Sequence, residues 1–445
     1  MNLFWKRLFR TLESTAKTEA YYQSLIEAHK RYHVVAKSKE LEEYKRLFEI
    51  VKSSKFKEQK KIWVNRKYRD TQEYRDMRSY KRYAGSAHLR FYYENLENEA
   101  LKEFLDFKKT NNYKKLGIPS EVKKSPDLKR LKKYEKSAAY KNYTRFHNSY
   151  VVQEFERLKV KIATEEFQKS NAFWENSRRW ETTEEYAVEH RYFALADSAD
   201  IQFYLNTDPK QFSQLDILHQ TFRDTFDGKT LDTASWESRF YYPKEVLKPI
   251  HSFANEKQAN TGGNNLSVQD SCLRIETRQE KHSAIAWDAT KGFTQKEFNY
   301  TSDIVHGRNA VYQKTGLFRA KIRFEGTKPT QAFCLKGDGK TPHINICLCN
   351  GKSIEVGVFW KSRNETKYVS RKITGIKPSE YYIYTLIWTS RQLVWYINNL
   401  EVFRTSEGVP SEPVYPQFSA FIPENRKGGA GCLKVDWIEV YSKNK

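Results

Sequence analysis

Glycine is almost missing from the first half of this chain. Of 18 glycines in 445 residues, only Gly85 and Gly117 precede residue 220, and proline is nearly as scarce there. Glycine and proline interrupt helices, so a long stretch without them that is dense in Lys, Glu, Leu, Ala and Tyr predicts helices. After about residue 215 the glycines return between alternating apolar segments, a pattern typical of strands joined by turns.

Three further absences exclude whole classes of protein. No apolar run of about 18 residues occurs, so the sequence predicts no membrane-spanning helix. The opening, MNLFWKRLFRTLES, lacks the apolar stretch and small-residue cleavage site of a secretory signal. The five cysteines lack paired spacing and predict no disulfide framework. These features predict a cytoplasmic protein, with a peripheral position at the membrane as the alternative.

Positive charge is concentrated near the N-terminus. Residues 1–150 contain 37 Lys and Arg against 19 Asp and Glu, which is +18 of the total net charge of +23. A basic region rich in tyrosine suits nucleic acid, an anionic surface or an acidic partner. No known nucleic-acid-binding motif accompanies it, so we favour the interpretation that the aromatic residues form a core and the charges face solvent.

The helical half contains an internal repeat. Phe56 and Trp63 recur, with the same separation between them, as Phe167 and Trp174. Six more residues, Thr71, Tyr74, Tyr80, Ser86, Phe91 and Tyr92, recur at a nearly identical offset as Thr183, Tyr186, Tyr192, Ser198, Phe203 and Tyr204. The recurring Ser-x-x-Leu/Ile pattern predicts helix starts capped by the serine hydroxyl. We therefore expect a stack of short helices with aromatic contact faces.

The first twelve residues have an amphipathic pattern. One helical face would carry Leu3, Phe4, Trp5, Leu8, Phe9 and Leu12. Such a helix can lie in a membrane interface or dock on the body of the protein, and docking is the commoner case.

Four segments of the second half resemble the family-16 glycoside hydrolases. They are TFRDTFDGKTLDTASW (221–236), NYTSDIV with KTGLFRAKIRF (299–324), YYIYTLIWTSRQLVWYINNLEVFR (381–404) and GCLKVDWIEVYSK (431–443). They keep the order that they have in that family. The resemblance implies an antiparallel jelly-roll sandwich of the concanavalin A-like lectin and glucanase type, which also agrees with the alternating strands.

The family's catalytic strand has the pattern E-x-D-x-x-E, in which the two glutamates act as nucleophile and acid/base. The corresponding segment here is TPHINICLCNGK, with His343, Asn345 and Leu348 at the three positions. In a shorter register Cys347 would take the last place. Neither register restores a carboxylate, and retaining hydrolysis needs two.

Alternatives remain for this region. Chemistry could have moved to Glu355 or Asp338, which would make the protein an active hydrolase. His343, Cys347 and Cys349 would share one face by alternation, but no fourth metal ligand is evident, so we predict neither a metal site nor a cofactor. Without hydrolysis, His343, Asn345 and Trp360 are the residues expected to bind a ligand.

The sequence therefore predicts two parts joined by a linker. Residues 1–206 would form the basic helical-repeat region, residues 207–214 the linker, and residues 215–445 the sandwich. We expect residues 214–445 to fold alone. The predicted function is non-catalytic binding of a glycan, or a scaffold for a protein partner. Active hydrolysis and nucleic-acid binding by residues 1–150 are the alternatives.

Overall fold

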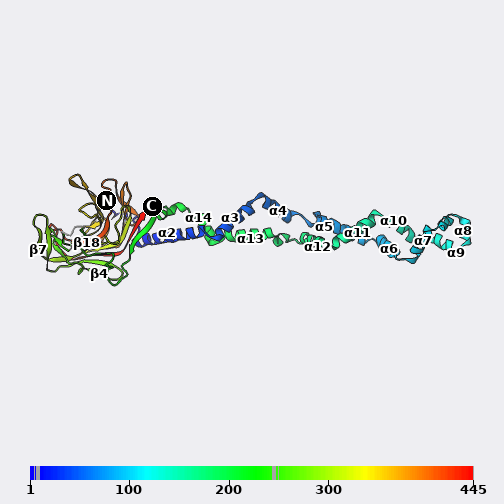
Figure 1. Cartoon of the computed structure of the whole chain (residues 1–445), viewed down its shortest axis with the longest axis horizontal. Coiled ribbons are helices and arrows are strands. Elements are labelled where there is room, and N and C mark those ends of the chain that lie inside the picture. The colour runs from blue at the N-terminus through cyan, green and yellow to red at the C-terminus, as the bar shows by residue number, and fades with distance from the viewer. Residues whose placement is uncertain (5, 7–10, 243–246, 249, 444–445) are drawn as a thin grey trace. The chain divides into compact units, whose positions relative to one another are not determined.

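The computed structural model describes residues 1–4, 6, 11–242, 247–248 and 250–443 (Figure 1). The chain divides into two compact units. The helical unit is Val34–Asn206, and the sandwich unit combines Met1–His33 with Thr207–Lys445. This differs from the expected division, which placed all of residues 1–206 in the helical region.

Short helices build the helical unit. They are α3 (Lys39–Lys52), α4 (Ser54–Asn65), η1 (Tyr68–Asp70), α5 (Gln72–Ala84), α6 (Ala87–Leu96), α7 (Glu99–Lys109), η2 (Asn111–Gly117), α8 (Pro119–Lys124), α9 (Pro126–Glu135), α10 (Ala138–Phe146), α11 (Tyr150–Ala163), α12 (Glu165–Glu175), η3 (Arg179–Thr182), α13 (Glu184–Ala196) and α14 (Ala199–Asn206).

A serine or threonine side chain caps most of these helices. In each case the hydroxyl accepts a hydrogen bond from the backbone N–H at the third position after it, as at Ser38, Ser53, Thr71, Ser86, Ser125, Ser137, Ser149, Thr164, Thr183 and Ser198. The predicted helix starts are therefore confirmed. Each such cap contributes about 1 kcal/mol, which matters most for helices of only about three turns.

The repeat in the sequence corresponds to two copies of one arrangement, α3–α6 and α11–α14. The second copy runs back along the first, so that α3 packs against α13 and α5 against α11 (Figure 1). Tyr44 stacks on Tyr192 with ring centroids 5.6 Å apart, and Tyr80 stacks on Phe155 at 5.5 Å. These pairs are equivalent, since Tyr44 corresponds to Phe155 in the repeat and Tyr80 corresponds to Tyr192. The aromatic residues thus form the core that joins the two copies.

Two antiparallel sheets face one another in the sandwich unit. Its strands are β1 (Leu218–Asp224), β2 (Ser252–Phe253), β3 (Gln258–Asn260), β4 (Leu266–Val268), β5 (Leu273–Thr277), β6 (His282–Asp288), β7 (Gly292–Phe298), β8 (Tyr300–Ser302), β9 (Ile304–His306), β10 (Gly316–Glu325), β11 (Thr330–Lys336), β12 (His343–Cys349), β13 (Ile354–Ser362), β14 (Glu365–Ile373), β15 (Tyr382–Trp388), β16 (Leu393–Ile397), β17 (Leu400–Thr405), β18 (Tyr415–Phe421) and β19 (Gly431–Lys443).

One sheet has the order β17-β16-β15-β10-β19-β5-β4, with β1 also paired to β19, and the other has the order β14-β13-β12-β11-β18-β9. Small sheets β2-β6-β7 and β3-β8 lie beside them. Between the two large sheets the core includes Trp236, Trp388, Trp395, Phe318, Phe333 and Phe418. The predicted jelly-roll class is confirmed by this antiparallel sandwich.

The N-terminal segment belongs to the sandwich core. Leu3 and Leu12 are buried in it, and the backbone N–H of Leu3 donates to the carbonyl of Thr374 at 2.7 Å. For these two residues docking on the body of the protein is confirmed. Trp5, Leu8 and Phe9 of the predicted amphipathic face lie outside the described residues.

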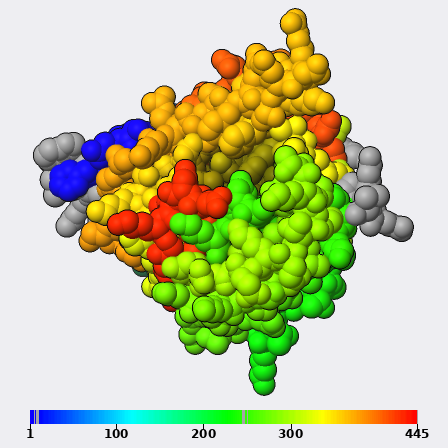
Figure 2. Space-filling view, turned by 90° about the vertical axis from the view of Figure 1, so that its left-hand side faces the viewer, coloured from blue at the N-terminus to red at the C-terminus, as the bar shows by residue number. Residues whose placement is uncertain are grey.

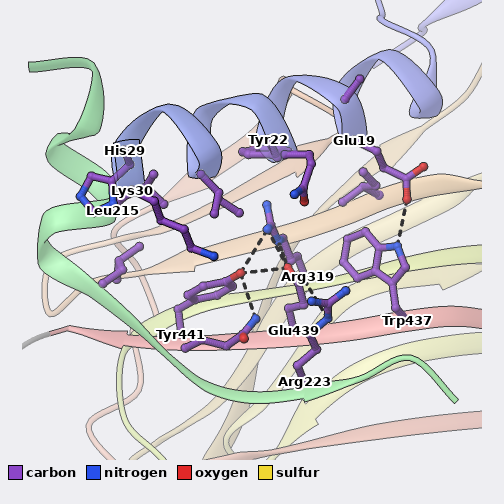
Figure 3. Close-up of a pocket in the computed structure, with 16 residues that line it drawn as sticks. Glu19, Tyr22, His29, Lys30, Leu215, Arg223, Arg319, Trp437, Glu439 and Tyr441 are labelled. Carbon is purple, nitrogen blue, oxygen red and sulfur yellow. Dashed lines mark hydrogen bonds and ion pairs between the residues drawn. The ribbon is translucent and has the colours of Figure 1, made fainter. Parts of the chain in front are cut away.

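Helix α2 (Thr15–Ala36) lies over the face of the eight-stranded sheet that points away from this core (Figure 3). Arg319, Lys321 and Arg323 alternate along β10 and point to this face, because Phe318, Ala320 and Ile322 point into the core. Glu19 of α2 lies 3.1 Å from the Lys321 ammonium and accepts a hydrogen bond of 3.0 Å from the Trp437 indole. Among the described helices none is long and apolar enough to cross a membrane.

This packing predicts which fragment of the chain folds. A variant in which a Gly/Ser linker of about eight residues replaces residues 34–206 should unfold cooperatively, because every core contribution of the sandwich unit is kept. Residues 214–445 alone should be several kcal/mol less stable or aggregate, because they lack Leu3, Leu12 and α2. Thermal unfolding of both proteins followed by circular dichroism checks this, and equal stability would contradict the assignment of residues 1–33.

The repeat predicts equal effects of equivalent substitutions. Leu47 and Leu158 occupy corresponding positions of the two copies, and both are buried. Leu47→Ala and Leu158→Ala should each lower the unfolding free energy of the helical unit by about 2–5 kcal/mol. Val160→Ala is the control, since that side chain is 69% exposed on the same helix as Leu158. Urea denaturation measures all three, and a large difference between the two leucine variants would contradict the equivalence.

Candidate functional site

Strand β12 carries the degenerate motif, and it contains a β-bulge. Asn345 pairs with Gly357 of β13 and Leu348 pairs with Glu355, so Ile346 and Cys347 together oppose a single residue. Such an extra residue shifts the alternation of side chains by one position. As a result His343, Asn345 and Leu348 all line one cavity, whereas Ile346 and Cys347 are buried in the sandwich core.

The bulge decides between the two registers of the motif. Leu348 stands at the last position facing the cavity, and Cys347 does not. The expectation that His343, Cys347 and Cys349 share one face is wrong, because both cysteines belong to the core between the sheets. Burial raises the pKa of the Cys347 thiol well above its usual value, so this group stays protonated.

We call the space in front of His343, Asn345 and Leu348 the motif cavity. Its volume is about 170 Å³. Its lining also includes Phe240, Phe253, Glu256, Asn260, Asp303, Lys336 and Gln417. Figure 2 shows a hollow between a wall coloured yellow to orange and a wall coloured green, which are the segments after about residue 320 and before about residue 300. The lining of the motif cavity comes from residues 240–260, 303–304, 332–348 and 417–421, which are distant in the sequence.

His343 is held as a neutral imidazole. Its Nδ1 lies 3.2 Å from the Nζ of Lys336. Burial, together with the positive charge of Lys336, lowers the pKa of His343 to about 3. Burial also lowers the pKa of Lys336. Neutral His343 cannot donate a proton as an imidazolium near neutral pH, which fits hydrogen bonding better than acid catalysis.

Two buried polar atoms in the motif cavity have no hydrogen-bond partner among the described residues. They are Nε2 of His343 and Oδ1 of Asn345. Leaving a buried polar atom unpaired costs about 1–3 kcal/mol, so such atoms are usually satisfied by solvent or ligand. The two side chains lie close enough to interact with each other, and each keeps unused hydrogen-bonding capacity.

The structure places the other predicted residues outside this cavity. Asp338 accepts hydrogen bonds from Arg308 at 3.2 Å and Tyr312 at 2.7 Å, and Glu355 accepts one from Tyr368. Trp360 lines a different hollow, beside Pro342 and Gly408. Of the three expected binding residues, only His343 and Asn345 come together.

Glu256 is the residue that the sequence analysis missed. It lines the motif cavity opposite β12, and its carboxylate accepts a hydrogen bond of 2.6 Å from Gln258. Burial raises the pKa of Glu256 to about 7. No local pattern marks this residue, because its approach to β12 depends on contacts between segments that are far apart in the chain.

The chain matches no protein-family model and no curated protein. Solved structures that it is similar to include the laminarinase catalytic domain of Thermotoga maritima, at 17% identity and a TM-score of 0.42, covering 52% of this chain and 100% of that one. The endo-β-1,3-glucanase of Pyrococcus furiosus is 19% identical, with a TM-score of 0.42 and coverage of 51% and 95%. A non-specific endo-β-1,3(4)-glucanase of family 16 is 18% identical, with a TM-score of 0.42 and coverage of 51% and 95%. Each of these three glucanase structures is similar to about half of this chain, and the likeness is one of fold.

Proposed function

We propose that the sandwich unit binds a glycan in the motif cavity and does not hydrolyse it. The observation that carries this proposal is that all three motif positions face the cavity, and none of them is a carboxylate. The side chains of His343 and Asn345 line the cavity, and Nε2 of His343 and Oδ1 of Asn345 make no hydrogen bond with the described residues. Hydroxyls both donate and accept hydrogen bonds, so a carbohydrate can satisfy an imidazole nitrogen and an amide oxygen at once.

An active hydrolase with moved carboxylates is the second candidate, and Glu256 is the observation that favours it. A carboxyl group with a pKa of about 7 is suited to act as a general acid. Retaining chemistry also needs a carboxylate nucleophile, and the other acidic residue lining the motif cavity is Asp303.

The Asp303 carboxylate is hydrogen-bonded to the surrounding backbone. Its two oxygens accept hydrogen bonds of 2.9–3.1 Å from the backbone N–H groups of residues 261, 262, 263 and 265. The hydroxyl of Thr261 donates another at 2.6 Å. An anion so fully bonded is a poor nucleophile, because attack would break these bonds. Glu256 therefore lacks a partner for hydrolysis among the described lining residues.

The glycan hypothesis predicts binding without turnover. The full chain should bind a polysaccharide such as laminarin or a mixed-linkage β-glucan, measured by affinity electrophoresis, and release no reducing ends. Asn345→Ala and His343→Ala should weaken binding about tenfold or more, because each removes a buried hydrogen bond of about 1–3 kcal/mol. Asn364→Ala, at an exposed position between β13 and β14, should leave binding unchanged.

Two outcomes of this experiment would contradict the proposal. Reducing ends that disappear in Glu256→Gln would show that the protein is a hydrolase. Failure to bind any member of a broad polysaccharide panel would leave a protein-binding scaffold as the function of the sandwich.

The raised pKa of Glu256 predicts a dependence of stability on pH. Between its ordinary value of 4.5 and about 7, the folded protein keeps a proton that the unfolded chain loses. The unfolding free energy should therefore fall as the pH rises through this window, by at most about 3 kcal/mol, and level off above it. Glu256→Gln should remove this fall, because the amide does not ionise.

Urea denaturation at pH 4.5, 6 and 8 measures this effect. Glu424→Gln is the matched control. Glu424 is exposed, and its backbone N–H donates a hydrogen bond to the carbonyl of Asn255, next to Glu256. The control should keep the pH dependence of the wild type. If the unfolding free energies of the wild type and of Glu256→Gln change equally with pH, the Glu256 carboxyl group is solvated and the prediction is wrong.

A further inference from the structure

Two histidines and an aspartate meet at a second place in the sandwich unit. His29 and His33 lie one turn apart on α2, and Asp216 belongs to the short helix α15 (Ser213–Ile217). The Nε2 of His29 lies 2.8 Å from Oδ1 of Asp216, and the Nε2 of His33 lies 3.3 Å from the same oxygen. The two Nε2 atoms are 3.0 Å apart. Three potential ligand atoms therefore converge on one point.

The sequence and its local packing position these side chains. Because His33 follows His29 by one helical turn, both lie on the same face of α2. The buried ring of Phe212 packs against His29, with ring centroids 5.3 Å apart, and holds the segment before α15 beside α2. Figure 3 shows His29 on α2 beside Leu215 of α15. The convergence thus depends on a buried contact next to the three residues.

Hydrogen bonds alone satisfy this arrangement poorly. If both Nε2 atoms donate to Asp216, their hydrogens are forced towards each other across 3.0 Å. A cation removes this conflict, because all three atoms then act as donors of electron pairs to one centre.

The spacing also fits an ion. Ligand atoms about 2.0–2.1 Å from a tetrahedral Zn²⁺ are separated by about 3.3 Å, close to the three distances of 2.8–3.3 Å found here. Two imidazoles and one carboxylate are also a common donor set for such ions. The side chains of His33 and Asp216 are 50% and 45% exposed, so water can complete the coordination.

We propose that His29, His33 and Asp216 bind one divalent transition-metal ion of the Zn²⁺ class. The site is separate from the motif cavity, and it includes neither the cysteines nor the histidine of β12. The sandwich unit ends at His33 and resumes at Thr207, on either side of the helical unit. The ion would therefore tie together, within the sandwich unit, the two segments that border the helical unit. Its role would be structural.

The test uses the full chain after treatment with a chelator. Titration with Zn²⁺ in competition with a chromophoric chelator should show one ion per chain, and Zn²⁺ should raise the melting temperature. His29→Ala/His33→Ala should weaken binding at least tenfold and abolish the shift in melting temperature. His88→Ala/His190→Ala is the matched control, because it removes two exposed histidines from the helical unit.

Asp216→Asn is a second variant that removes one charge from an exposed position and keeps the side-chain shape. It should weaken Zn²⁺ binding without changing the far-ultraviolet circular dichroism spectrum. The proposal is overturned if the wild type binds no Zn²⁺. It is also overturned if Asp216→Asn and the His29/His33 double variant both bind the ion as tightly as the His88/His190 control.

Discussion

The extra residue in β12 determines the chemistry of the motif cavity. With strict alternation, His343, Asn345 and Cys347 would lie on one face of the strand. Because of the bulge, Cys347 points into the core and Leu348 lines the cavity instead. A leucine can neither donate nor accept a proton. The bulge therefore leaves the motif strand with one apolar and two neutral polar side chains facing the cavity, so any carboxylate in the cavity comes from other segments of the chain.

The features that the sequence predicted are those set by local patterns. Alternating strands, glycine-rich turns and serine caps depend on close neighbours in the chain, so the sandwich and the helix starts could be predicted. Glu256 could not, since it reaches the cavity through β2, β3 and their contacts with distant strands. The position of Trp360 away from His343 could not be read from the sequence either, because it depends on the turn at Gly408, which packs against the indole in another hollow.

The helical unit shows how a repeat can determine tertiary structure. A helix of about three turns buries too little apolar surface to be stable alone. Each copy instead supplies one face of aromatic and aliphatic side chains. The faces of the two copies pack against each other with their helices in opposite order, α3 against α13 and α5 against α11. The equivalent stacks of Tyr44 on Tyr192 and of Tyr80 on Phe155 follow from this. A sequence repeat indicates equivalent local structure, but it does not determine whether the copies stack end to end or pair side by side.

A buried charge explains why α2 belongs to the sandwich unit. The Arg319 guanidinium is almost fully buried and makes an ion pair of 2.6 Å with Glu439 (Figure 3). Its open side is covered by the ring of Tyr22 from α2, 4.4 Å away. A buried cation is tolerated only when it is paired and its surroundings are ordered. The sheet therefore carries on its outer face charges that need α2, and Met1–His33 completes the sandwich although the whole helical unit lies between this segment and the strands in the chain.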